Sequence, residues 1–150
     1  MRRHGFSLVE LIIVVIILGI VAAIAVPRLS NAAEGSRYNA AHQGFRNINT
    51  AMNAYYMDHQ SYPPNAAIAT LPKEMVGYLH ENAFTKAPPI GRAWDWNGPG
   101  SGINRYGINL SIHTVPADDI TEMESRFDDG DTTTGLYRAW KGYLIWPVGP

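Results

Sequence analysis

The sequence predicts an α+β protein in which one long N-terminal helix packs on a small antiparallel sheet. Three observations predict this fold. Residues 6–26 form an apolar run of membrane-spanning length, residues 29–57 repeat apolar side chains at helical spacing, and the chain after residue 92 alternates strand-like segments with glycine-rich turns. A chain of 150 residues has room for only one sizeable core.

The composition excludes several classes of protein. The chain has 12 Lys and Arg against 13 Asp and Glu, so it lacks the basic excess typical of nucleic-acid-binding proteins. It has no cysteine, which excludes a disulfide scaffold and a thiolate zinc site. The five histidines show no metal-ligand spacing, and no catalytic triad order or phosphate-binding loop is present. We therefore expect no enzyme, no cofactor and no nucleic-acid partner.

The apolar run predicts a membrane helix. It holds 18 hydrophobic residues in 21 positions, and a helix of this length spans roughly 31 Å, enough to cross a bilayer. A buried core helix would instead show an amphipathic stripe. A cleaved secretory signal is the other alternative, but the run is long for one and the Ala23 and Ala25 site is weak. Arg2 and Arg3 precede the run, which favours a cytoplasmic N-terminus.

Glu10 is the one ionisable residue inside this run. A carboxylate in lipid costs a few kcal/mol unless it is paired, so an acid there is by default a functional candidate. A residue at the membrane edge that reaches the headgroups is the alternative. The residues alone leave both interpretations open.

Residues 5–10, Gly-Phe-Ser-Leu-Val-Glu, followed by the apolar run, resemble the class III signal of type IV pilins and type II secretion pseudopilins. The resemblance implies that residues 1–5 are a leader, which a prepilin peptidase removes by cutting between Gly5 and Phe6. It also implies methylation of the new Phe6 amine. Glu10 would then pair with the Phe6 amine of a neighbouring subunit during filament assembly, which supplies the opposite charge that a buried acid needs.

The resemblance also implies partners and a location. The partners are further copies of the chain, other pseudopilins, the prepilin peptidase, and an inner-membrane assembly platform with its ATPase. The subunit would cross the bacterial inner membrane once, with a periplasmic head, and then enter a periplasmic or extracellular filament.

Two features favour the pseudopilin branch of this family. Residues 56–63 resemble the Tyr-x-x-Asp…Tyr-Pro signature of major pseudopilins, and the cysteine pair common in adhesive pilins is missing. A major or minor type IV pilin, with a tip, adhesion or DNA-uptake role, is the alternative. A non-polymerising anchor, and a binding module that uses the four tryptophans, stay open as well; these are Trp94, Trp96, Trp140 and Trp146.

The predicted pilin-like architecture divides the chain after the leader into three parts. Residues 6–26 form a transmembrane and polymerisation helix, residues 27–58 its amphipathic half, and residues 59–150 a globular head. Pro27 lacks an amide donor and is expected to kink or locally melt the helix without ending it. The apolar face of the amphipathic half comprises Ala41, Phe45, Ile48, Met52 and Tyr55.

In the head we expect a helix over residues 71–81, with Thr70 as its N-cap, and a second helix over residues 117–127. Strands are expected at residues 92–97 and 104–113, joined by a turn, and at residues 135–146 with an interruption at 141–142.

One acidic loop is a candidate metal site. Asp128, Asp129 and Asp131 lie close together with hydroxyl residues and a glycine, which suits calcium. Major pseudopilins often hold calcium in a C-terminal loop, which the resemblance therefore suggests here. The full twelve-residue ligand pattern is absent, however, so the sequence favours a polar turn after a helix.

Overall fold

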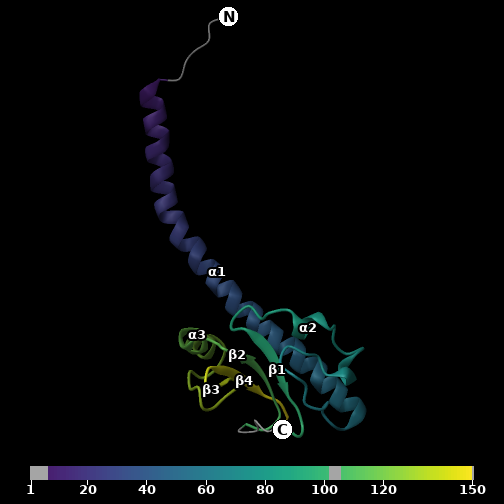
Figure 1. Cartoon of the computed structure of the whole chain (residues 1–150). Helices are drawn as coiled ribbons and strands as arrows, with labels where there is room; N and C mark the ends of the chain where they lie inside the picture. Colours follow the sequence, from purple (N-terminus) through teal and green to yellow (C-terminus); the bar gives the residue numbers. More distant parts are fainter. Residues whose placement is uncertain (1–6, 102–105, 150) are drawn as a thin grey trace, which may run out of the picture. The chain divides into compact units, whose positions relative to one another are not determined.

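A computed structural model describes residues 7–101 and 106–149 (Figure 1). The chain forms two compact units, Met1–Ser36 and Arg37–Pro150, and each is described by itself. The α+β class is confirmed, with a long N-terminal helix and a four-stranded antiparallel sheet. The predicted leader and the Gly5–Phe6 cleavage pair lie outside the described residues.

The long helix α1 runs from Leu8 to His59, so it passes through both units. Pro27 lies inside α1 and does not end it, as expected. The helix is assigned without interruption at that position, so local melting is not observed. A kink at Pro27 stays a prediction.

In the second unit one stripe of α1 is buried in the core of the head. Its members are Tyr38, Ala41, Phe45, Ile48, Ala51, Met52 and Tyr55. The spacing of three and four residues places them on one face of the helix. All five positions of the predicted apolar face are therefore buried, and the helix ends within one residue of the expected Asp58.

The sheet contains four short strands in the order β1-β2-β4-β3, all antiparallel to their neighbours. The strands are β1 at Ala93–Asn97, β2 at Asn109–His113, β3 at Arg138–Trp140 and β4 at Tyr143–Pro147. The helix α3 at Ala117–Phe127 precedes the second hairpin and has the predicted bounds.

The strands lie beside the C-terminal half of α1 (Figure 1). Because successive strand residues point to opposite faces, alternate side chains of the sheet pack on this helix. Phe45 of α1 meets Trp94 of β1 at 5.0 Å and Trp146 of β4 at 5.6 Å between ring centroids. Gly44 allows this approach, because a Cβ there would lie 2.8 Å from the Trp94 ring.

The two edges of the sheet are short or covered. At one edge, β3 has only three residues. At the other, the segment after α1 runs along β1, where the Ala69 amide donates to the Trp94 carbonyl at 2.8 Å. The Trp96 indole likewise donates to the Pro63 carbonyl at 3.0 Å.

The helix predicted over residues 71–81 is wrong. The segment instead forms a 3-10 turn at Lys73–Met75 and a four-residue helix, α2, at Asn82–Thr85. Gly77 interrupts it with a φ of +100°, a left-handed conformation that does not continue a helix. Thr70 does not act as an N-cap, because its hydroxyl donates to the Ile68 carbonyl.

The predicted strands are confirmed in type and pairing, but the second is shorter than expected. The hairpin of β1 and β2 forms, and so does the interrupted final segment, as β3 and β4. β2 begins at Asn109 instead of residue 104, since Gly107 has a positive φ. Residues 104 and 105 lie outside the described residues.

The packing of Phe45 gives a first prediction. Phe45→Ala removes a fully buried ring that contacts Trp94, Tyr137 and Trp146, so it should lower the free energy of unfolding of the head by about 3–5 kcal/mol. Chemical denaturation of the full chain in micelles, followed by near-UV circular dichroism, measures this loss. The control is Met57→Ala on the same helix, which is 72% exposed and should cost little. Equal losses from both variants would contradict the assigned core.

Candidate functional site

The N-terminal part of α1, up to Leu29, is a largely apolar rod that no other part of the described chain covers. Its large side chains are 48–75% exposed, from Leu8 to Leu29. The helix is long and apolar enough to cross a membrane, and none of its most apolar 18-residue window is buried. Uncovered apolar surface of this extent requires lipid or other protein chains around it.

Glu10 caps the N-terminus of this rod. Its Oε2 accepts a hydrogen bond from the Ser7 backbone amide at 3.0 Å. Ser7 precedes the first helical residue, and Glu10 is the third residue of the helix, so the two form the Ser-x-x-Glu spacing of a capping box. The carboxylate also lies at the positive end of the helix dipole.

This capping contact was not predicted from the sequence, although the Ser-x-x-Glu spacing of residues 7–10 is visible there. It shows that Glu10 has a hydrogen-bond partner within its own chain. That partner, Ser7, is the second residue after the predicted cleavage point. Phe6, the predicted methylated residue, lies outside the described residues, so its distance to Glu10 is not described.

The second candidate site is the acidic loop after α3. The carboxylates of Glu124, Asp128 and Asp129 all bring an oxygen within 4.8 Å of one another. The sequence indicated Asp128 and Asp129 but missed Glu124, which lies one helical turn before the loop and faces the interior. Only the fold shows that this acid points inward.

Glu124 is an unusual buried acid. It is 1% exposed, and neither carboxylate oxygen has a hydrogen-bond partner among the described residues. Burial, and then the charges of Asp128, Asp129 and Asp131, raise the pKa of Glu124 to about 7. Buried carboxylates are normally paired, hydrogen-bonded or bound to a metal.

The other loop acids have partners. Asp128 accepts a hydrogen bond from the Tyr137 amide at 2.7 Å. Asp131 accepts from the amide and the hydroxyl of Thr133, and these bonds lower its pKa. Asp129 accepts from the Asp131 amide at 2.9 Å and from the Thr134 hydroxyl at 3.0 Å. Asp129 and Asp131 therefore form the polar turn that the sequence favoured, while Asp128 and Asp129 also lie close to Glu124.

Comparisons with known proteins show which proteins this chain is similar to. Residues 1–26 match the model of the prokaryotic N-terminal methylation motif. The chain is similar to type II secretion system core protein G of Pseudomonas aeruginosa, with 27% identity over 67% of this chain and 77% of that protein. Core protein G of Dickeya chrysanthemi aligns at 27% identity over 91% of this chain and 92% of its own length.

The type IV major pilin PilA of Myxococcus xanthus is 30% identical over 84% of this chain, which spans only 59% of that pilin. No solved structure matches the chain significantly. The chain carries the N-terminal methylation motif and is similar both to type II secretion core proteins and to type IV major pilins.

In the pilin-like head, the residues that resembled the pseudopilin signature make hydrogen bonds near the end of α1. Tyr62 donates to the Asn53 side chain at 3.0 Å, and Asp58 accepts from the Tyr78 hydroxyl at 2.6 Å. The chain after α1 is thus tied back onto the end of that helix.

The tryptophans divide into two groups in this pilin-like head. Trp94, Trp96 and Trp146 are at most 7% exposed in the core. Their burial counts against the binding module in which all four tryptophans contact a ligand. Only Trp140, on the edge strand β3, is half-buried.

Proposed function

We propose that this chain is the filament-forming subunit of a type II secretion pseudopilus, assembled from the inner membrane after prepilin peptidase processing. The observation that carries the proposal is the uncovered apolar rod, which carries a single acid, Glu10, near its start and within the methylation motif of residues 1–26. Similarity to core protein G over nearly the whole chain supports the secretion branch.

Two environments cover the apolar surface of the rod in turn. Before assembly, lipid covers its apolar surface, and the basic leader holds the N-terminus on the cytoplasmic side. In the filament, the rods of other copies replace lipid, so packing and not a change of fold drives the transfer. Repetition of one such contact without closure produces a helical filament.

Glu10 has a defined task in this transfer. In the free subunit it caps its own helix through the Ser7 amide. Cleavage creates a positive amine at Phe6, directly before this cap. In a low-dielectric bundle of rods, the amine of one subunit and the Glu10 carboxylate of another neutralise each other, which fixes the axial register of the two chains.

Mass spectrometry of the mature chain tests the processing step. We expect a chain that begins at N-methylated Phe6, because residues 1–26 match the methylation motif. The control is Gly5→Leu, which alters only the cleavage pair and should leave the full-length chain. An intact N-terminus in the wild type, or cleavage after Ala25, would overturn the proposal.

Two Glu10 variants test the assembly step. Glu10→Ala removes both the cap and the charge, whereas Glu10→Gln keeps a capping side chain and removes only the charge. If charge pairing is required, both variants are processed, but neither enters filaments, and cells with either as the sole copy lose secretion into the medium. Glu34→Ala, an exposed acid on the same helix outside the apolar run, should behave as wild type.

Normal filaments from Glu10→Gln would reduce the role of Glu10 to capping. Loss of surface pili with intact secretion would instead assign the chain to a type IV pilus, the alternative that the Myxococcus pilin similarity favours.

We further propose that the acidic loop of the head binds one calcium ion. Glu124, Asp128 and Asp129 would hold it, and the ion would supply the positive charge that the buried, unpartnered Glu124 lacks. The ion would join α3 to the loop that leads into β3, and so stabilise the folded head.

Calcium should therefore raise the thermal denaturation midpoint of the full chain, and a chelator should lower it again. At a concentration one hundred times the dissociation constant, the expected stabilisation is about 2.7 kcal/mol. Glu124→Gln should abolish the calcium effect, whereas Glu122→Gln, an exposed acid of the same helix that pairs with Arg126, should retain it. No midpoint shift with calcium in the wild type would refute the site.

A further inference from the structure

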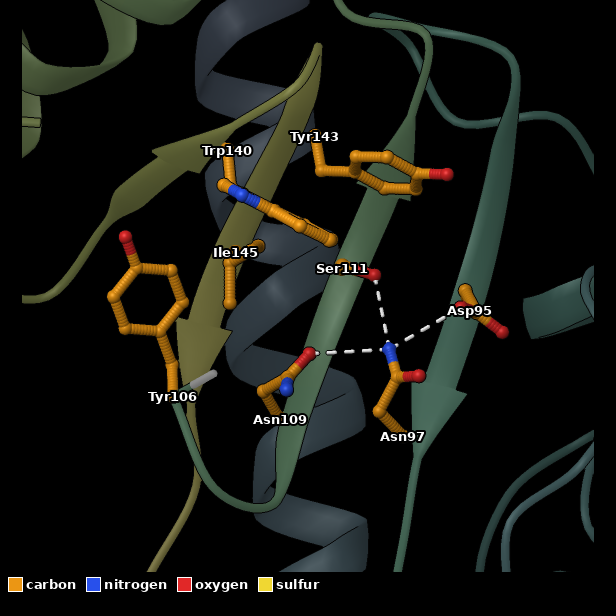
Figure 2. A pocket seen from close by; sticks show the side chains of 8 residues that line it. All are labelled: Asp95, Asn97, Tyr106, Asn109, Ser111, Trp140, Tyr143 and Ile145. Carbon is orange, nitrogen blue, oxygen red and sulfur yellow. Dashed lines mark hydrogen bonds between the residues drawn. The ribbon is translucent and has the colours of Figure 1, made fainter. Parts of the chain in front are cut away.

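The outer face of the sheet, opposite the core, carries a row of buried polar side chains. Asp95 and Asn97 of β1 stand beside Ser111 and Asn109 of β2 in register. Figure 2 shows these side chains in front of the sheet, with α1 passing behind it. All four are at most 5% exposed, which is unusual for the face of a sheet that no helix covers.

A single amide organises this polar row. The Asn97 Nδ2 donates toward Asp95, Asn109 and Ser111 at 3.2, 3.1 and 3.3 Å (Figure 2). Asp95 also accepts from, or pairs with, the His113 Nε2 at 2.9 Å. The side chains are thus fixed in place before any ligand arrives, as preorganised binding groups are.

Several polar atoms at this face remain unused. In Asp95, Oδ2 alone makes these contacts. The Ser111 hydroxyl accepts from Asn97 but donates to no described residue. The Trp140 indole N–H and the Tyr143 hydroxyl also make no hydrogen bond within the described part of the chain. Donors and acceptors are therefore both available on this face.

Aromatic rings form the rim of this pocket. The rings of Trp140 of β3 and Tyr143 of β4 stack at an angle of 28°, with centroids 6.0 Å apart, and Tyr106 also lines the pocket (Figure 2). Both charge signs are present, because Lys141 stacks over Trp140 and Asp95 lies within the pocket. A second cation, Arg138, lies over the Tyr106 ring. The pocket therefore offers hydrogen bonds and apolar ring surface between charges of both signs.

The enclosed space is small. It measures about 10 Å³, close to the minimum that holds one water molecule. The polar floor can therefore take one hydroxyl group, and the rest of a ligand must lie on the aromatic rim. A ligand that fits has one hydroxyl beside an apolar C–H face, and further hydroxyls for Trp140 and Tyr143.

We propose that this outer face binds a neutral sugar unit, with one hydroxyl inserted between Asp95 and Ser111 and the ring lying on Trp140 and Tyr143. This assignment is independent of the secretion role proposed above, since it concerns only the head. It assigns a function to Trp140, the one tryptophan outside the core.

Saturation-transfer NMR on the full chain in micelles of a detergent without a sugar headgroup tests the proposal. The probes are the methyl glycosides of glucose, galactose, mannose and N-acetylglucosamine. We expect at least one to receive saturation at millimolar concentration, with transfer strongest at the C–H face of its ring. Trp140→Ala should weaken its binding at least tenfold, and Ser111→Ala about threefold to tenfold.

Tyr56→Ala, which removes an aromatic ring from α1 away from this face, is the matched control and should bind as wild type does. Near-UV circular dichroism shows whether each variant keeps the head folded, and Tyr143→Phe serves as the conservative variant should Trp140→Ala unfold it. No transfer to any glycoside, or equal transfer with Trp140→Ala, would overturn the proposal. Binding of tetramethylammonium in place of the glycosides would overturn it in favour of a cation cage.

Discussion

The packing of the sheet on one stripe of α1 is the interaction on which the head depends. The four strands are three to five residues long and have one apolar face, so they could not form a stable layer by themselves. Phe45 supplies the missing surface, because its ring touches Trp94, Tyr137 and Trp146. The amphipathic half of α1 is therefore part of the head's core, and the compact unit begins at Arg37 for this reason.

One helix thus serves two kinds of surroundings. Up to Val26 its side chains are almost all apolar and exposed, and they require lipid or other protein chains. From Tyr38 onward a single stripe is buried by the chain's own sheet. One α-helix continues through both parts, although Pro27 supplies no amide hydrogen bond to it. The proposed function uses both parts, because the rod packs in the filament and the stripe carries the head.

The sequence was informative wherever a pattern is local. The period of α1, the bounds of α3 and the pairing of β1 with β2 all follow from residue spacing. The helix expected around residues 71–81 failed because the positive φ of Gly77 outweighs the helix-forming residues on either side. Glu124 could not be assigned to the acidic site, since only tertiary packing turns it inward. The outer polar row was equally hidden, because its members come from different strands and alternate with core residues.

The treatment of the sheet edges matters for a protein that is meant to assemble. An open strand edge is a template for pairing with any other strand, and such pairing is hard to reverse. Here β3 is too short to serve as a template, and the segment through Ala69 occupies the Trp94 carbonyl on β1. In the proposed filament, these edges disfavour strand pairing between neighbouring heads. Lateral contact between subunits then falls to the rods.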